Sequence, residues 1–267
     1  MITKYAFATR VGYNPSNPAK MNQDSYILTP NIEGLAQNFK HFFSVCDGHG
    51  TNGHYVSAFV KERLPELVKH HMQQAKLTYD LDETVDKLTV NDYKAIFENA
   101  FLDCDREMIE DQDEFNVKLS GTTVCSVLFD GTRVHCANAG DSRAMTVRIF
   151  KNQELGPGRD KVRMVSVPLS VDHKPELPEE RKRILEKGGR IDSFHDADNN
   201  NEPLGPQRVW LPDQELPGLA MSRSLGDTVA HSVGVSSAPE VKSFLISPDD
   251  KFIVIGSDGV WEFLSNE

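Results

Sequence analysis

The chain has 267 residues and a formal net charge of -11, which suits one domain with its own core and argues against nucleic acid or an anionic membrane as a partner. It contains no run of 18 apolar residues and no basic, apolar leader, so the sequence predicts neither a membrane span nor a signal peptide. Its four cysteines are dispersed and three lie within apolar runs, which favours buried reduced thiols and an intracellular protein, cytoplasmic or also nuclear.

The first half of the chain predicts a buried strand followed by two long helices. The apolar run 42–46 is rich in residues that favour strands. Apolar residues then recur at three- and four-residue spacing over 55–72 and again over 93–108, as on one face of an amphipathic helix. Pro65 should kink the first helix, and Asn91 is a candidate N-cap for the second.

The pattern changes to strands after residue 122. Strand-forming residues occupy 124–129, 133–139 and 144–150, and Asp130-Gly131 separates the first two runs at hairpin spacing. We therefore expect an antiparallel meander. A last strand, over 251–257, runs into an Asp-Gly pair.

A segment with little periodicity extends from Asp192 to Gly218, after a short helix predicted over 179–186. Long loops in compact domains are usually functional or disordered, so we interpret 192–218 as a mobile surface flap within a single domain spanning 1–267. Such a flap would suit substrate choice, with Trp210 exposed or half buried near its end. The alternative is a plain variable insertion.

Carboxylates gather near the ends of the predicted strands. Asp47 follows the first buried strand, Asp258 follows the last one, and Asp24 precedes an apolar pair. A carboxylate on a rigid strand suits Mg²⁺ or Mn²⁺, which prefer oxygen ligands, and Gly48 would let a backbone carbonyl join them. The alternative is that each Asp-Gly pair is only a turn, as we expect for Asp130-Gly131.

Ordered motifs extend over nearly the whole chain. They are Asn22-Gln23-Asp24, Asp47-Gly48-His49-Gly50, Ser120-Gly121-Thr122-Thr123, Gly140-Asp141-Ser142-Arg143, Asp172-His173-Lys174-Pro175, Glu186-Lys187-Gly188-Gly189, Met221-Ser222-Arg223-Ser224, Pro239-Glu240-Val241 and Ser257-Asp258-Gly259. In these motifs the chain resembles the PP2C (PPM) family of metal-dependent serine/threonine protein phosphatases. The resemblance implies an α+β fold, a four-layer α/β/β/α sandwich with two central antiparallel sheets.

The resemblance also implies a centre that binds two Mg²⁺ or Mn²⁺ ions and a weak third one. The implied metal-site residues are Asp24, Asp47, Gly48, Asp141, Asp258 and Glu262. Asp47 would bridge the two cations, Asp258 would bind one of them, and Asp24 would act through water. Asp141 and Glu262 would flank the third cation beside Asp258, and Glu262 replaces the aspartate common in the family.

Two further residues are implied to act on the substrate. His49 matches the histidine proposed as general acid for the leaving alkoxide, and a turn histidine without a catalytic role is the alternative. The family's phosphate-binding arginine is replaced by Ala19, and the neighbouring Lys20 would supply a point charge instead. The alternative for Lys20 is a solvated surface lysine. We interpret Arg143 and Arg223 as structural residues.

The resemblance thus implies hydrolysis of phosphoserine and phosphothreonine in proteins by a water activated between two metals. The sequence lacks the Cys-x5-Arg loop of phosphatases that use a cysteine nucleophile. Phosphoproteins are the expected partners. Relative to the family, the sequence ends before a strand, helix and strand that carry a further metal ligand. We therefore expect a fragment, a domain completed by a protein partner, or a degenerate member. The alternative function is a weak or inactive pseudophosphatase that acts as a binding or structural module.

Overall fold

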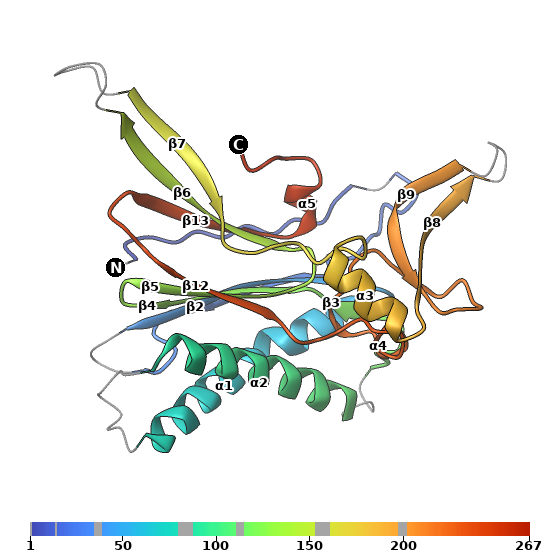
Figure 1. Cartoon of the computed structure of the whole chain (residues 1–267), viewed down its shortest axis with the longest axis horizontal. Helices are drawn as coiled ribbons and strands as arrows, with labels where there is room; N and C mark the ends of the chain where they lie inside the picture. The colour runs from blue at the N-terminus through green and yellow to red at the C-terminus, as the bar shows by residue number, and fades with distance from the viewer. Residues whose placement is uncertain are drawn as a thin grey trace.

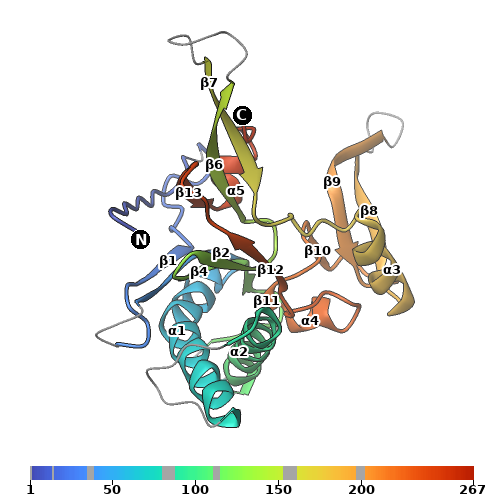
Figure 2. The same cartoon turned by 60° about the vertical axis from the view of Figure 1, so that its left-hand side comes forward.

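A computed structural model describes residues 2–13, 15–34, 39–79, 88–110, 115–152, 161–196 and 202–267 of the chain. Two antiparallel sheets face each other, and helices α1 (Gly53–Thr78) and α2 (Val90–Glu110) cover the outer face of the larger one (Figure 1, Figure 2). The expected α+β architecture with two central antiparallel sheets is confirmed. None of the described helices is both long and apolar enough to cross a membrane.

The larger sheet has seven strands and carries the first acidic motifs. Six of them follow one path, and β1 (Asp24–Thr29) pairs with β2 beside this path. In order across the sheet, the path contains β11 (Leu225–Gly226), β3 (Gly121–Thr122), β2 (Lys40–His49), β4 (Val124–Asp130), β5 (Arg133–Ala139) and β12 (Glu240–Leu245). Strand β2 extends beyond the predicted run as far as His49, because β3 pairs with its last two residues.

The smaller facing sheet contains β13 (Asp250–Gly256), β6 (Arg143–Asn152) and β7 (Lys161–Pro168), in that order. The predicted meander is therefore right for β4 and β5 but wrong for β6, which crosses to the other sheet. Gly140 turns the chain between β5 and β6 at a φ of 115°, where a Cβ would lie 2.6 Å from the Thr123 side chain. The short helix α5 (Asp258–Trp261) follows β13 on the side where the resemblance implies a second helical layer.

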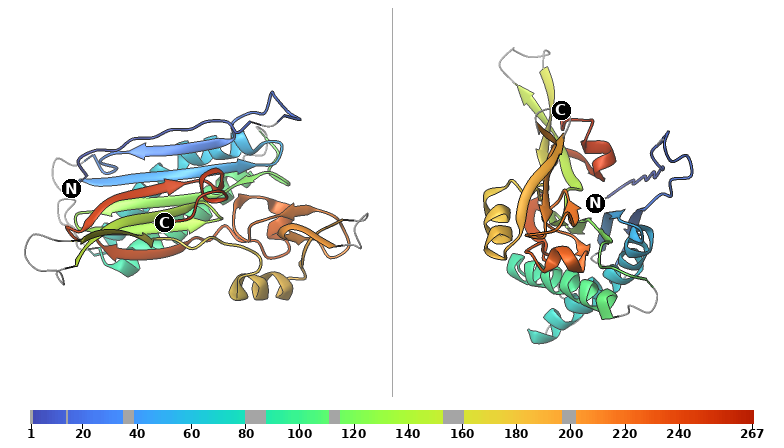
Figure 3. Two further views of the ribbon diagram at one scale, coloured as in Figure 1. Left: turned by 90° about the horizontal axis from the view of Figure 1, so that it is seen from above. Right: turned by 90° about the vertical axis from the view of Figure 1, so that its right-hand side faces the viewer.

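The described residues in 190–196 and 202–219 form a third sheet rather than an irregular loop. Strands β8 (Arg190–Asp196), β9 (Glu202–Trp210) and β10 (Pro217–Leu219) pair beside helix α3 (Pro178–Glu186), and helix α4 (Thr228–His231) follows. Figure 3 shows this flap projecting from one end of the sandwich. The expectation of little regular structure is therefore wrong for the described part, while residues 197–201, with the asparagine run, lie outside the described residues.

Aromatic side chains that contact one another across the flap strands account for the regular structure of the flap. Such contacts between strands leave no periodic pattern in the sequence. Trp210 is 2% exposed, contrary to expectation, and its Nε1 donates a hydrogen bond of 2.9 Å to the Asp192 carbonyl. Phe194 meets the Trp210 ring edge-on, and the Arg190 guanidinium lies 5.5 Å from that ring.

Two cores hold the sandwich together. The first lies between the helices and the large sheet and includes the fully buried Phe42 and Phe97. The second lies between the two sheets and includes Val127. All four cysteines are buried free thiols, as expected.

The two long helices form where the sequence predicts them, but the N-cap of the second is a different residue. Helix α1 continues through Pro65 as one helix. Thr89, not Asn91, caps α2: the Asp92 amide donates to Thr89 Oγ1 and the Thr89 amide donates to an Asp92 carboxylate oxygen.

Candidate active site

Strand pairing brings the first two acidic residues together. Strands β1 and β2 run antiparallel, with Asp24 directly opposite Asp47. Side chains at directly opposed positions emerge on the same face of a sheet, so the two carboxylates are neighbours although they are far apart in sequence. The register follows from the pairing of apolar residues along the same two strands.

Asp258 joins them from the other sheet. It is the first residue of α5, directly after β13, and the preceding Ser257 Oγ donates a 3.1 Å hydrogen bond to Asp24 Oδ2. The Asp47 carboxyl lies near the Asp24 and Asp258 carboxyls and interacts electrostatically with both. We call Asp24, Asp47 and Asp258 the acidic cluster.

The cluster is electrostatically unfavourable on its own. Burial, together with repulsion from Asp24 and Asp258, raises the pKa of Asp47 well above its usual range. Three carboxylates this close resist simultaneous ionisation, and a hard divalent cation with a preference for oxygen would relieve the repulsion. The chemistry of this donor set therefore fits Mg²⁺ or Mn²⁺.

The backbone at Gly48 also fits a crowded oxygen-lined site. A Cβ at this position would lie 2.3 Å from the Gly53 carbonyl oxygen and 2.6 Å from that of Gln23, so a larger residue would push these segments apart. Within the described ranges, however, no group of three or more His, Cys, Asp or Glu side chains is arranged so that it could hold a metal ion. The acidic residues therefore lie close together but do not form a complete coordination shell.

Asp141 lies in the loop between β5 and β6 and is 2% exposed. Burial raises its pKa, the nearby Asp258 adds to this effect, and the Lys174 ammonium, which donates a hydrogen bond to Asp141 Oδ2, opposes it. Among the described residues, Asp141 Oδ1 has no hydrogen-bond partner. The role of Lys174 could not be predicted from the sequence, because a pair separated by 33 residues leaves no local pattern.

His49 is held by a carboxylate from the far end of the chain. Its Nε2 lies 2.6 Å from Asp227 Oδ2, and Asp227 is 2% exposed. Burial alone would lower the pKa of His49, but the Asp227 carboxylate outweighs it and the pKa is raised. Nothing in the sequence spacing indicated Asp227 as the partner of His49, because the two residues are far apart in the chain.

Two predicted site residues, Lys20 and Glu262, make no side-chain contact with the acidic cluster, Asp141 or His49 among the described residues. Lys20 is exposed in the segment before β1, and Glu262 is exposed after α5. The amide of Glu262 donates to the Asp258 carbonyl at 2.7 Å. In the part of the chain that the structure describes, neither side chain forms a hydrogen bond or an ion pair.

The two motif arginines make the contacts expected of structural residues. Arg143 forms a two-pronged pair with Asp172 and lies 5.4 Å from the Trp261 ring, which ties β6 to the helix that begins at Asp258. Arg223 pairs with the buried Glu180 of α3.

Comparison with known proteins gives consistent matches. Residues 16–267 match the family model described as "Protein phosphatase 2C". The chain is 32% identical over 275 residues to "Probable protein phosphatase 2C 35" of Arabidopsis thaliana, covering 98% of this chain and 71% of that protein. It is 37% identical over 252 residues to "Probable protein phosphatase 2C 48" of Oryza sativa subsp. japonica, covering 92% of this chain and 67% of that protein.

A solved structure agrees on the fold. The serine-threonine phosphatase 2C from Toxoplasma gondii superposes with a TM-score of 0.73 over 92% of this chain and 76% of that one. The two sequences are 22% identical, so this likeness concerns the fold alone.

Proposed function

Because the chain belongs to the protein phosphatase 2C family, and is therefore a protein phosphatase, we propose that it hydrolyses phosphoserine and phosphothreonine in proteins with two divalent cations as cofactors. The observation that carries the proposal is the acidic cluster, in which residues from β1, β2 and the start of α5 meet. Because the carboxylates in the cluster repel one another, a bound cation would stabilise their ionised forms.

Asp24, Asp47 and Asp258 would hold Mg²⁺ or Mn²⁺, and the Gly48 carbonyl is the proposed additional donor. When bound, the cations would lower the pKa of a water that attacks phosphorus and would neutralise charge on the phosphate oxygens. The carboxylates themselves would fix where the phosphate approaches, because each is anchored on a strand end or a helix start.

His49 is the proposed general acid. Protonation of the leaving alkoxide requires a protonated imidazole, and the Asp227 carboxylate, which raises the pKa of His49, favours this form. Asp227 would fix the orientation of the ring through its contact with Nε2.

Three further residues have proposed roles around the acidic cluster. Asp141 and Glu262 would hold the weaker third cation, for which Asp141 offers a buried oxygen without a partner among the described residues. Lys174 already pairs with this carboxylate and would compete with such a cation. Lys20 would bind the substrate phosphate through the single positive charge of its ammonium group.

The second candidate function is a weak or inactive family member that acts as a binding module. One observation favours it, namely that no group of three acidic, histidine or cysteine side chains within the described residues is arranged to hold a cation.

Hydrolysis of a phosphothreonine peptide by the full chain, measured against Mn²⁺ concentration, separates the two functions. We expect Mn²⁺-dependent turnover that falls by about 100-fold or more in Asp47→Asn, a loss typical when a group that stabilises the transition state is removed. Calorimetry should show Mn²⁺ binding that weakens in the same variant. Asp213→Asn, an exposed aspartate in the flap, is the matched control. Turnover that persists in Asp47→Asn would contradict the proposal, and no turnover at any Mn²⁺ concentration would favour the binding module.

A further inference from the structure

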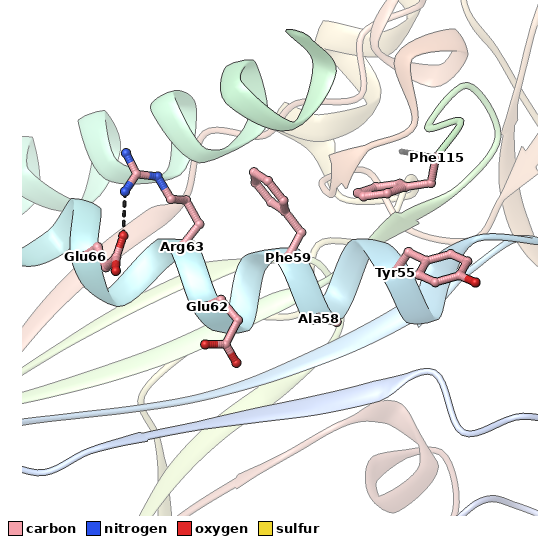
Figure 4. A pocket seen from close by; sticks show the side chains of 7 residues that line it. All are labelled: Tyr55, Ala58, Phe59, Glu62, Arg63, Glu66 and Phe115. Atoms are coloured by element: carbon pink, nitrogen blue, oxygen red, sulfur yellow. Dashed lines mark hydrogen bonds and ion pairs between the residues drawn. The ribbon is translucent and has the colours of Figure 1, made fainter. Parts of the chain in front are cut away.

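An open groove of about 560 Å³ lies along the N-terminal half of α1, outside the acidic cluster. Figure 4 shows its lining, with aromatic side chains at one end and charged ones at the other. The residues that matter here are Tyr55, Phe59, Glu62, Arg63 and Glu66 of α1, and Phe115 from the segment that precedes β3.

The aromatic end is a firm apolar wall. The Phe115 ring stacks on Tyr55 with centroids 5.9 Å apart and meets Phe59 edge-on at 6.3 Å. Phe59 and Phe115 pack against the core beneath the large sheet, while Tyr55 is 53% exposed. The wall is therefore anchored from below, and the exposed Tyr55 ring, which also contacts the His54 ring with centroids 4.0 Å apart, forms its outer edge.

The charged end carries an excess of negative charge. The Arg63 guanidinium donates to Glu66 at 2.6 Å and to Glu107 at 2.5 and 3.0 Å, so two carboxylates already neutralise it. Glu62 is exposed and forms no hydrogen bond or ion pair with any described residue. Glu62 and Glu66 lie one turn apart on α1, and Figure 4 shows the Glu62 carboxylate pointing away from the Arg63 guanidinium. A cation bound in the groove would thus find an unoccupied carboxylate.

This combination selects one kind of occupant. An apolar side chain would pack on the aromatic wall, and a neighbouring lysine or arginine would pair with Glu62 and contact the exposed part of the Tyr55 ring. An acidic ligand would be repelled by the groove and by the net charge of -11. A helix rises about 1.5 Å per residue, so Tyr55 and Glu62 are separated by roughly 10 Å, the length of about three extended peptide residues.

The groove adjoins the candidate active site. Helix α1 begins at Gly53, whose backbone packs so tightly on Gly48 that a Cβ would lie 2.7 Å from the Gly48 carbonyl carbon. Asn52 ties this junction to the segment carrying Phe115, because its side chain donates to the Asn116 carbonyl at 2.8 Å. A polypeptide held in the groove therefore lies beside the strand that carries Asp47.

We propose that the groove docks a basic, apolar segment of the phosphoprotein substrate, separate from the phosphorylated residue. The inference rests on the proposed phosphatase function, and it names the class of substrate: proteins that carry a lysine or arginine next to an apolar side chain at a distance from the phosphosite. Affinity comes from the aromatic wall, and selection against acidic segments comes from Glu62 and Glu66.

Binding of an unphosphorylated, fluorescently labelled peptide to the full chain tests this without relying on turnover. The peptide carries two lysines around a leucine, and a second peptide carries glutamates in place of the lysines. We expect the basic peptide to bind at least about tenfold more tightly, and to lose about tenfold in affinity in Tyr55→Ala and in Glu62→Lys. Glu179→Lys, an exposed glutamate on α3, should bind like the unmodified chain.

Kinetics on the same variants separate this inference from the proposed function. A phosphothreonine peptide that carries the basic segment should have a lower KM than one without it. Glu62→Lys should remove this difference in KM, while kcat and the hydrolysis of p-nitrophenyl phosphate stay unchanged. Equal binding of the two peptides, or equal binding by all variants, would overturn the docking groove even if p-nitrophenyl phosphate is hydrolysed. Loss of all hydrolysis with intact peptide selectivity would instead count against the phosphatase proposal.

Discussion

His49 Nε2 lies 2.6 Å from Asp227 Oδ2, a contact between residues 178 positions apart. Asp227 is itself fixed, because the same oxygen accepts a 2.6 Å hydrogen bond from Ser224 Oγ. Gly121 makes room for the pair, since a Cβ there would lie 2.2 Å from Asp227 Oδ2. The carboxylate is thus held in place to stabilise the protonated imidazole.

Replacing this carboxylate should shift the pH dependence of catalysis. Asp227→Asn keeps the size of the side chain but removes the charge that raises the pKa of His49, so this pKa falls. Activity that requires a protonated His49 would then be lost at lower pH. We expect the alkaline limb of the kcat profile on a phosphothreonine peptide to move to lower pH.

NMR titration of the His49 ring gives a readout that a purely structural role would not move. Its midpoint should fall in Asp227→Asn and stay unchanged in the exposed control Asp213→Asn. An unchanged midpoint in Asp227→Asn would show that the carboxylate does not set the protonation of His49.

The acidic cluster should cost stability when no divalent cation is present. A carboxyl whose pKa is raised on folding destabilises the fold as pH rises above its unfolded value of about 3.9, until the pH reaches the folded pKa. In EDTA, the free energy of unfolding should therefore decrease with rising pH, by at most about 1.4 kcal/mol per pH unit from Asp47. Asp47→Asn should remove this slope and be neutral or stabilising at pH 7. Denaturant titrations across pH measure both effects, and a slope that survives in the variant would count against repulsion at Asp47.

Glu180 should control stability in acid. Burial would raise its pKa, but hydrogen bonds from Arg183 and Arg223 outweigh burial and hold the pKa well below its usual range. A depressed carboxyl pKa contributes stability above the unfolded value of about 4.3, and this contribution is lost as the pH falls below that value. Glu180→Gln should cost about 3 kcal/mol at pH 7 and remove this part of the acid dependence. The exposed neighbour Glu179→Gln should change stability by less than about 0.5 kcal/mol; an equal effect of both variants would refute the network.

Parts of the molecule with a local pattern could be predicted from the sequence. The apolar repeat over 55–72 gave α1, and the strand-end positions of Asp24, Asp47 and Asp258 correctly predicted carboxylates that meet. For α1 the backbone geometry of a single element decides which side chains are buried, and for the carboxylates the position of each at the end of a strand or the start of a helix places them at a shared edge.

The remaining features depend on contacts between distant segments. The Lys174–Asp141 pair and the His49–Asp227 contact join residues that are 33 and 178 positions apart in the sequence. The crossing of β6 to the second sheet depends on space beside Thr123, which is a property of the packed structure. The order of the flap comes from Trp210 packing across strands, where apolar alternation is weak.

Lys174 should weaken divalent cation binding at Asp141. Its ammonium occupies one oxygen of this buried carboxylate and lowers a pKa that burial raises, so Lys174→Met leaves the charge uncompensated. Without cations, we expect the variant to lose about 1–3 kcal/mol of stability, as is usual for a buried group that loses its partner. Added Mn²⁺ should then raise the melting temperature more in Lys174→Met than in the unmodified chain, because the cation replaces the missing ammonium. Lys182→Met, an exposed lysine on α3, controls for loss of a positive charge. If Mn²⁺ raises the melting temperature equally in all three proteins, the lysine and the cation do not share the Asp141 carboxylate.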